Sequence, residues 1–438
     1  SNARTGWFSE TWRQLGRAAT ADRVPGNWLL LGEVPPALGS LFDDPLTAAS
    51  WDRSTAPDGV LVGAGAAEDL LAALHEVAGH PTGPVWCVTS RAVGVGTVDD
   101  PAADVRAAGV WGLGRVAGLE LPDRWGGLVD LPERIDDATR RALAGTLTDD
   151  GADDQDGEDQ LAVRDGQLWA RRLVTTPAPQ TGTWTPKGTV LITGGTGGLG
   201  GHVARRVAEQ GSADRILLLS RQGSAAPGAT ELLEGIRAFG ATAEAVAVDV
   251  TDRAAMSGLI DALAAEGAPV RTVVHAAGVV RDVRIAETGA EELAAQMAAK
   301  VEGALLLDEL LPDLDDFVLF SSISGIWGAA GQAGYAAGNA CLDALARRRR
   351  EQGKRAVSVA WGPWAGGGML TEHDERELRK RGLTPLLVPA ALQAMEQAIM
   401  SDRAGDPVVA DVTWSRFLPA FTASRPSPLF GSFEEKAA

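Results

Sequence analysis

The chain has 438 residues, of which 45% are hydrophobic, and a formal net charge of −18 at pH 7. This length exceeds one ordinary domain and predicts two units of roughly 200 residues each. The acidic charge argues against a nucleic-acid partner, and no apolar run reaches the roughly 18 residues of a membrane helix. The two cysteines, Cys87 and Cys341, stand in apolar contexts, which indicates buried free thiols and a reducing, cytoplasmic compartment. We predict no metal site.

The first half of the chain shows a faint alternation of strands and helices. Apolar runs at residues 28–32 and 84–90 predict strands, and residues 105–119 predict a helix. These segments match, in this order, the strand at residues 190–193, the strand at residues 317–320 and the helix that carries Tyr335 in the second half. After Gly32, however, the sequence continues Glu-Val-Pro-Pro in place of a glycine-rich loop. We therefore predict a degenerate α/β copy without cofactor or catalysis; the alternative is chance similarity between α/β segments.

The middle of the chain predicts a hairpin followed by a linker. Residues 161–173 read as strand, turn and strand around Asp165-Gly166. Residues 175–182 are rich in Pro, Gly and Thr and are the best linker candidate. We place the boundary near residue 182, which gives a structural subdomain, 1–182, and a catalytic subdomain, 183–438.

The second half alternates short apolar strands with alanine-rich helical stretches. This pattern is typical of a doubly wound parallel sheet. The predicted fold class is therefore α/β, with two Rossmann-like subdomains, of which the second is catalytic. The predicted strands of the second half are residues 190–193, 215–219, 243–248, 272–275, 317–320, 357–361 and 407–412.

A glycine-rich loop follows the first of these strands and opens a helix. Glycines in this context let the pyrophosphate of a dinucleotide approach the backbone N–H groups at a helix N-terminus. The alternative is an ordinary glycine-rich turn. The predicted cofactor-binding residues of the loop are Thr193, Gly194, Gly195, Thr196, Gly197, Gly198, Leu199 and Gly200.

The end of the next strand indicates which dinucleotide binds. An NAD-binding unit usually has Asp or Glu here, to hold the ribose 2′-hydroxyl. This chain has Ser220-Arg221. A guanidinium can hold a 2′-phosphate with two hydrogen bonds, whereas a carboxylate would repel it. We predict NADPH as cofactor; the alternative is a solvated Arg221.

The third and fourth strands end in further candidate cofactor contacts. Asp249 and Val250 are expected near the adenine. His275 ends the fourth strand, and we interpret it as a structural histidine rather than a base. The small residues expected to pack against the ribose follow it: Ala276, Ala277 and Gly278.

Four residues form a candidate reaction centre. Tyr335 is the only tyrosine of the chain, Asn339 follows one helical turn later, and Ser322 ends an apolar strand. Free tyrosine, with a pKa of about 10, donates protons reluctantly, and a nearby cation such as Lys300 would lower that pKa. These residues predict a nicotinamide-dependent carbonyl reductase. The alternatives are a solvated helix face for Lys300, a strand-end cap for Ser322 and a surface position for Asn339.

These motifs resemble the short-chain dehydrogenase/reductase superfamily, and specifically the ketoreductase domains of modular type I polyketide synthases. Most single-domain members carry Lys four residues after the Tyr. In this chain that position is Asn339, and the lysine, Lys300, lies upstream of the tyrosine, as in the synthase ketoreductases. Ser322 matches the family's catalytic Ser, thirteen residues before Tyr335. Residues 110–132 resemble the family's structural subdomain. The resemblance implies a β-ketoacyl thioester on an acyl carrier protein, flanked by other synthase domains.

The resemblance also implies a stereochemical type. Members called A-type, which give the L-configured alcohol, carry a Trp eight residues before the Tyr, where this chain has Trp327. The B-type motif Leu-Asp-Asp is replaced by Val-Arg-Asp at residues 280–282. Gln332 stands where the subtype acting on epimerised substituents has His. We expect the A-type, non-epimerising alcohol; for Trp327 the alternative is ordinary core packing.

A glycine-containing segment after the sixth strand of the second half resembles the family's substrate lid. It spans residues 361–370 and precedes a polar helix at 371–381. Met369 is expected to contact the substrate there; the alternative is a disordered surface loop. Two other functions remain open for the whole chain: a free-standing reductase of small ketones, and a catalytically silent structural module.

Overall fold

The computed structural model describes residues 5–16, 21–97, 100, 102–148, 157–180, 182–366, 370–401 and 405–434. In the second half, the strands are β9 (Thr189–Thr193), β10 (Arg215–Ser220), β11 (Thr242–Ala247), β12 (Val270–His275), β13 (Asp316–Ser322), β14 (Val357–Trp361), β15 (Leu383–Thr384) and β16 (Val408–Val412). Its helices are α4 (Gly198–Gln210), α5 (Ala229–Arg237), α6 (Arg253–Ala265), α7 (Ala290–Met297), α8 (Gly303–Leu310), α9 (Ile323–Trp327), α10 (Ala333–Glu351), α11 (Glu372–Lys380), α12 (Val388–Ile399) and α13 (Trp414–Phe421), with a π-helical turn, Ala298–Glu302, between α7 and α8. All seven strands predicted for this half are confirmed.

The first half is built from shorter elements of the same kinds. Its strands are β1 (Gly6–Gln14), β2 (Trp28–Gly32), β3 (Leu46–Thr47), β4 (Gly59–Gly63), β5 (Val85–Ser90), β6 (Trp125–Leu131), β7 (Gln160–Arg164) and β8 (Gln167–Thr175). Its helices are α1 (Ala67–Glu76), α2 (Val105–Glu120) and α3 (Asp137–Thr148), and a short 3₁₀ helix, Pro36–Leu41, follows β2. The hairpin predicted around Asp165-Gly166 is confirmed: both residues have positive φ, 50° and 68°, as a two-residue turn of this kind requires.

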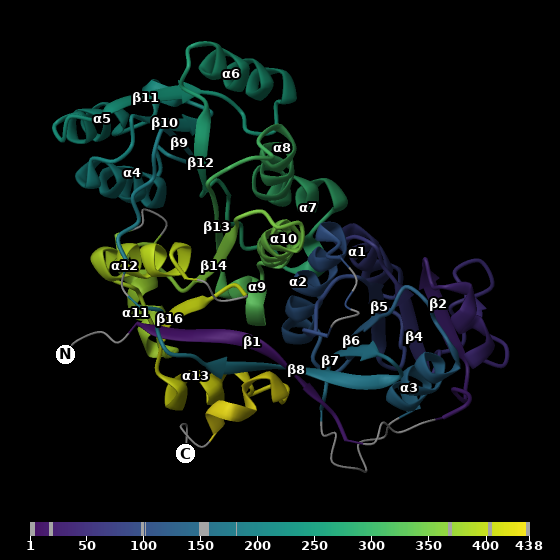
Figure 1. The fold of residues 1–438 in the computed structure, drawn as a ribbon. Helices are drawn as coiled ribbons and strands as arrows, with labels where there is room; N and C mark the ends of the chain where they lie inside the picture. The colour runs from purple at the N-terminus through teal and green to yellow at the C-terminus, as the bar shows by residue number, and fades with distance from the viewer. Residues whose placement is uncertain are drawn as a thin grey trace.

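One continuous sheet runs through both halves of the described chain. Its strand order is β11-β10-β9-β12-β13-β14-β16-β1-β8-β7-β6-β5-β4-β2-β3, and β15 pairs with β16 (Figure 1). The seven strands β11-β10-β9-β12-β13-β14-β16, neighbours in this order, are parallel to one another, as in a doubly wound fold. Reading outward from the junction, β6, β5, β4 and β2 repeat the order of β14, β13, β12 and β9. The first half is therefore a second α/β unit of Rossmann type, and the predicted correspondence of β2 with β9 and β5 with β13 fits this order.

The two halves meet at strand β1, which the sequence did not predict. Residues 6–8 of β1 pair antiparallel with β16 of the second half, and residues 8–14 pair with β8 of the first. In Figure 1, β1 and β8 cross the lower part of the view from one half to the other. Because β1 extends the second half's sheet, the beginning of the chain contributes to both units. The division at residue 182 stays a prediction.

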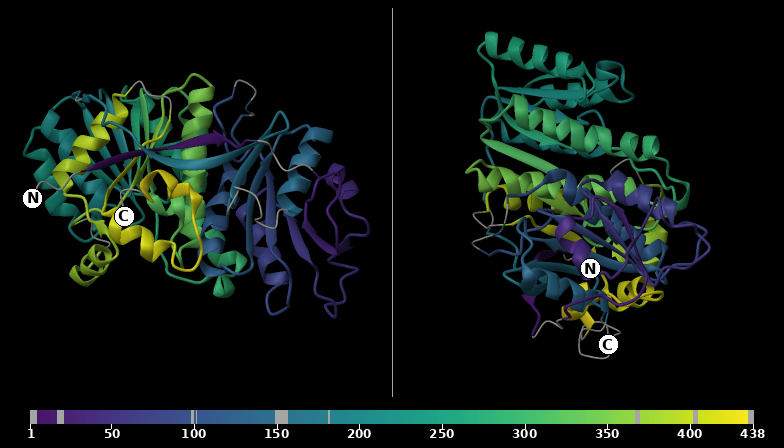
Figure 2. Two further views of the ribbon diagram at one scale, coloured as in Figure 1. Left: turned by 90° about the horizontal axis from the view of Figure 1, so that it is seen from below. Right: turned by 90° about the vertical axis from the view of Figure 1, so that its right-hand side faces the viewer.

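Helices α2 and α10 also join the halves, by packing against each other closely. A Cβ atom added at Gly112 of α2 would lie 2.3 Å from the carbonyl oxygen of Ala336 in α10, and one at Gly109 would lie 3.0 Å from Cys341 Sγ. Glycines therefore let the two backbones approach. The long helix α10 stands between the halves in the left view of Figure 2.

Two further observations concern the chain as a whole. Cys87 and Cys341 are both buried free cysteines, as predicted. Among the described residues, there is no helix with the length and apolar character needed to cross a membrane.

Candidate active site

The glycine loop lies at the carboxyl end of β9, where α4 begins. Gly194 has a φ of +64°, a left-handed conformation that favours glycine. A Cβ atom at Gly195 would lie 2.7 Å from the carbonyl oxygen of Ile192, and one at Gly200 would lie 2.3 Å from that of Gly194. Gly197 and Gly198, at the start of α4, are exposed. The backbone N–H groups at the start of α4 fit the pyrophosphate of a dinucleotide. A side chain at Gly195 or Gly200 would collide with the backbone of the loop and its strand.

The predicted contacts on the next two strand ends adjoin this loop. Ser220 Oγ accepts a hydrogen bond from the backbone N–H of Gly223 at 2.9 Å, and Arg221 is exposed. Asp249 accepts hydrogen bonds from the backbone N–H and the hydroxyl of Thr251, at 2.9 and 2.7 Å, which lower the pKa of its carboxyl. Asp249 is therefore a carboxylate at neutral pH, and Val250 after it is buried.

The end of β12 also adjoins the glycine loop. A Cβ at Gly194 would lie 3.0 Å from both the carbonyl oxygen of Ala276 and the backbone nitrogen of Ala277. His275 is fully buried and uses both ring nitrogens: Nδ1 hydrogen bonds to Thr193 Oγ1 at 2.7 Å, and Nε2 to the carbonyl oxygen of Lys300 at 2.9 Å. Burial lowers the pKa of His275 to about 4. This doubly hydrogen-bonded ring agrees with the interpretation of His275 as a structural histidine.

Lys300 is buried, although its predicted helix would have allowed a solvated position. Only 4% of the residue is exposed, and burial lowers its pKa to about 8. Its Nζ donates to the carbonyl oxygen of Phe320 at 3.0 Å and lies 5.1 Å from the ring centroid of Tyr335. Glycines make room for the side chain, because a Cβ at Gly278 would lie 2.9 Å from Lys300 Cε and one at Gly338 would lie 3.4 Å from Cδ.

Tyr335 lies in the first turn of α10, between Lys300 and Ser322. Burial raises the pKa of its phenol, while the neighbouring polar side chains of Asn339 and Ser322 lower it. Burial is the larger effect, so the phenol is protonated at neutral pH and can act as an acid. The structure thus brings Tyr335, Ser322, Lys300 and Asn339 together.

Ser322 and Asn339 are linked through a third polar residue, Ser324. Ser322 Oγ caps helix α9 by accepting from the N–H of Ser324 at 3.2 Å, so the cap proposed as its alternative role is also present. Ser324 Oγ lies 3.2 Å from Ser322 Oγ and 3.4 Å from Asn339 Nδ2. Asn339 is buried, not on the surface, and its Oδ1 has no hydrogen-bond partner among the described residues. That oxygen is free to accept from a water or an ammonium.

Sequence reasoning missed an acidic residue on the buried face of α10. Asp343 Oδ1 accepts from Ser358 Oγ at 2.6 Å, and burial raises the pKa of Asp343 to about 7. Its negative charge favours the protonated form of Lys300. The available signal was its position, eight residues after Tyr335 and therefore on the same side of the helix.

The three residues expected to act on substrate and stereochemistry occupy different environments. Trp327 is 4% exposed and packs against Phe417 and Phe430, with ring centroids 5.4 and 5.7 Å away. This agrees with the alternative of core packing. Gln332 precedes α10, and its Nε2 donates to Asp282 Oδ1 at 3.1 Å. Met369 lies outside the described residues.

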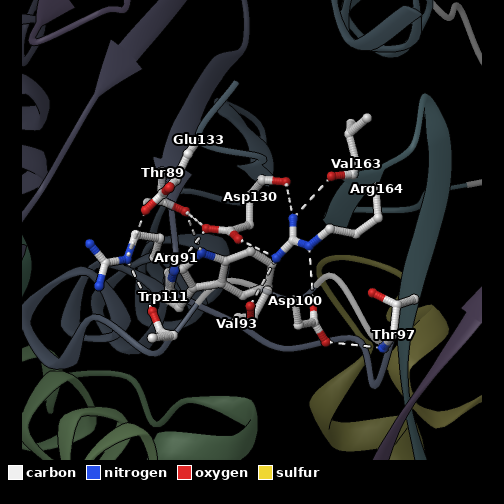
Figure 3. A network of polar contacts seen from close by, with 12 residues as sticks. Thr89, Arg91, Val93, Thr97, Asp100, Trp111, Asp130, Glu133, Val163 and Arg164 are labelled. Carbon is white, nitrogen blue, oxygen red and sulfur yellow. Dashed lines mark hydrogen bonds and ion pairs between the residues drawn. The ribbon is translucent and has the colours of Figure 1, made fainter. Parts of the chain in front are cut away.

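The corresponding strand end of the first half is closed by buried polar contacts (Figure 3). At the end of β5, Thr89 Oγ1 donates to Asp130 Oδ1 at 2.6 Å and accepts from Trp111 Nε1 at 3.0 Å. Arg164 forms ion pairs with Asp130 and Asp100 at 2.7 and 3.0 Å. At this strand end of the first half, polar side chains thus form hydrogen bonds and ion pairs with one another. Ser322 and Tyr335 lie at the corresponding strand end of the second half.

Comparison with known proteins gives the same picture for both halves. Residues 188–366 match the family model described as the KR domain, and residues 11–173 match the Rossmann fold domain of the polyketide synthase extender module SpnB. Erythronolide synthase EryA3 of Saccharopolyspora erythraea is 46% identical over 95% of this chain, and polyketide synthase GfsA of Streptomyces halstedii is 45% identical over 96%. The chain spans only 13% and 6% of the lengths of these two proteins.

Solved structures of similar length agree over the whole chain. A ketoreductase from the first module of phoslactomycin biosynthesis in Streptomyces sp. HK803 is 98% identical, with a TM-score of 0.96 over 99% of this chain and 100% of that one. A structure described as an A-type ketoreductase from a modular polyketide synthase is 36% identical, with a TM-score of 0.90 over 99% of both chains.

Proposed function

Because the chain belongs to the ketoreductases of modular polyketide synthases, enzymes that use a nicotinamide cofactor to reduce a keto group, we propose that it is an NADPH-dependent β-ketoacyl reductase. We further propose that its substrate is a thioester on the phosphopantetheine arm of an acyl carrier protein, and that other synthase domains flank it. The observation that carries the proposal is that Lys300 Nζ lies 5.1 Å from the centroid of the Tyr335 ring and that Ser322 also neighbours this tyrosine.

The chain's own residues would bind and protonate the substrate. Ser322 Oγ would donate a hydrogen bond to the keto oxygen, and the Tyr335 hydroxyl would transfer its proton to the same oxygen. When bound, NADPH supplies the hydride that the carbonyl carbon receives. Lys300, 5.1 Å from the tyrosine ring, would stabilise the phenolate that remains. Asn339 Oδ1 could hold a water through which Tyr335 regains a proton.

The choice of NADPH over NADH rests on the exposed Arg221. No carboxylate follows β10, and the guanidinium stands where a ribose 2′-phosphate would need a cation. The glycine loop would hold the pyrophosphate. Asp249 and Val250 would lie near the adenine, and residues 276–278 near the ribose.

We propose the A-type product, an L-configured alcohol with its α-substituent left unepimerised. The basis is the family pattern at Trp327, Gln332 and residues 280–282. In this structure Trp327 is buried, so any influence on stereochemistry would come through the position of its backbone segment rather than through an exposed indole. Met369 is proposed as a substrate contact from the family pattern alone.

A single assay separates this proposal from a free-standing ketone reductase and from a silent structural module. The purified chain is mixed with NADPH and either a 2-methyl-3-ketoacyl thioester or a small ketone, and the nicotinamide absorbance is followed. We expect faster oxidation with the thioester, and an L-configured alcohol by chiral chromatography. Faster oxidation with the small ketone would favour the free-standing reductase, no oxidation would favour the silent module, and a D-configured product would contradict the A-type assignment.

A further inference from the structure

Two segments of the catalytic half lie side by side near the reaction centre. One, residues 279–285, follows Gly278 beside Lys300; the other, residues 328–332, leads into α10 and Tyr335. They form a short parallel bridge in which the N–H of Val283 donates to the carbonyl oxygen of Gly331 at 2.8 Å. Between their side chains, Gln332 Nε2 donates to Asp282 Oδ1 at 3.1 Å. We call these segments the paired loops.

A carboxylate from the first half holds both paired loops at once. Glu120 Oε2 accepts from the backbone N–H of Ile285 at 2.7 Å, and Glu120 Oε1 accepts from that of Gly331 at 2.6 Å. Each oxygen therefore serves one loop. Both are short hydrogen bonds to an ionised acceptor, a kind that is stronger than a bond between neutral groups.

The position of Glu120 in its own helix supports a dedicated role. Glu120 is the last residue of α2, at the negative end of the helix dipole, where a carboxylate is unfavourable. Its two bonds to the paired loops offset that disadvantage. Glu120 thus adds little to the stability of helix α2. Its hydrogen bonds instead hold two segments that are more than 160 residues away in the sequence.

Helix α2, which carries Glu120, is held in a fixed position relative to Tyr335. Gly112 of α2 lies against the backbone of Ala336, the residue after Tyr335, so α2 cannot shift without moving α10. Arg115, also on α2, donates to the carbonyl oxygen of Gly325, two residues before Trp327. One helix of the first half therefore positions the paired loops and the Trp327 segment against the reaction centre.

We infer that Glu120 is a positioning residue for stereocontrol: its carboxylate fixes the spacing of the paired loops, and through them the side from which the thioester approaches Tyr335. This inference rests on the proposed reductase function. It goes beyond that function because it assigns control of the product ratio to a side chain of the first half that bonds to the backbone of the paired loops.

The test compares Glu120→Gln and Glu120→Asp with a matched control, Glu158→Gln. The glutamine variant keeps the shape but turns one acceptor into a donor, which cannot bond a backbone N–H. The aspartate variant keeps the charge but is one methylene shorter, so it cannot reach both loops. Glu158 is also a partly buried carboxylate of the first half, but it pairs with Arg172, away from the paired loops.

Two readouts are measured on the whole chain. Hydrogen exchange of peptides covering Ile285 and Gly331 reports the contact without any turnover. The ratio of alcohol stereoisomers from a 2-methyl-3-ketoacyl thioester reports its consequence. In both Glu120 variants, we expect these amides to exchange about tenfold faster and the ratio to fall about tenfold, which corresponds to about 1.4 kcal/mol. Glu158→Gln should change neither.

The outcomes separate this inference from the proposed function. A loss of stability alone would lower the total rate but not the stereoisomer ratio. An active wild type and Glu120 variants with the wild-type ratio would overturn the inference and leave the reductase intact. A wild type that reduces no β-ketoacyl thioester would overturn the proposed function, and with it the stereochemical role of Glu120, whatever the exchange rates are.

Discussion

We expect the buried ammonium of Lys300 to lower the stability of the folded protein, although catalysis depends on it. The pKa of its ammonium falls from 10.5 to about 8 on burial, which corresponds to roughly 3 kcal/mol of stability lost at neutral pH. In Lys300→Met this penalty disappears, and the hydrogen bond to Phe320, worth about 1 kcal/mol, is lost. The variant should therefore be more stable than wild type at pH 7, by about 2 kcal/mol.

The pH dependence of this difference follows from the direction of the pKa change. The unfolded chain keeps the Lys300 proton up to about pH 10.5, and the folded chain only up to about pH 8. Between these values the unfolded state binds more protons, so the stability of wild type rises with pH. The advantage of Lys300→Met should shrink by about 2 kcal/mol between pH 7 and pH 9.5. Urea unfolding at both pH values measures it, and Lys187→Met, at an exposed lysine, is the control.

Catalysis should change in the opposite sense to stability. Lys300 Nζ lies 5.1 Å from the centroid of the Tyr335 ring. At an effective dielectric constant of about 20, a unit charge roughly 5 Å from the phenolate would stabilise it by about 3 kcal/mol, or about 10²-fold in rate. Lys300→Met should be slower by that factor in the NADPH assay, and wild type should slow as the pH rises through about 8. A variant that is less stable than wild type at pH 7, or that keeps its rate, would refute this reasoning.

Three further substitutions test separate parts of the molecule. Tyr335→Phe removes the proton donor and keeps the packing, so the rate should fall by roughly 10² or more, with little change in urea unfolding; near-normal turnover would rule out Tyr335 as the acid. Arg221→Asp should raise the Kd for NADPH about tenfold or more and leave that for NADH nearly unchanged, as measured by fluorescence titration; a wild type without preference for NADPH would contradict it. Asp130→Asn leaves the buried Arg164 with one carboxylate fewer and should cost about 3 kcal/mol of stability by urea unfolding, with the Kd for NADPH unchanged; a loss below about 1 kcal/mol would show that the remaining partner suffices.

The second half could be predicted from the sequence because its central strands are almost fully buried. Such strands are continuous apolar runs, as in residues 190–193 and 317–320, and they stand out from the helices between them. Strand β1 was missed because it is only partly buried. Its sequence, GWFSETWRQ, mixes exposed polar residues with tryptophans, and its partners, β8 and β16, come from distant parts of the chain.

The members of the candidate site could be predicted from the sequence, but not their environments. Residue type and spacing single out Tyr335, Ser322 and Lys300. The burial of Lys300 depends on Gly278 and Gly338, which lie in other elements and leave space for its side chain. Spacing cannot show such a contact, because it reports only neighbours along one element.

The contacts of the first half with the second make physical sense as a support for the site. At the end of the first half's own strands, the buried carboxylate of Asp130 is paired with Arg164. What the first half supplies to the second half is backbone-directed hydrogen bonding: Glu120 to two loop N–H groups, Arg115 to the carbonyl oxygen of Gly325, and Arg171 to that of Ile326. Contacts to backbone atoms position a segment whatever its side chains are. A scaffold of this kind can hold the loops of the site in place while their side chains, which meet the substrate, are free to differ.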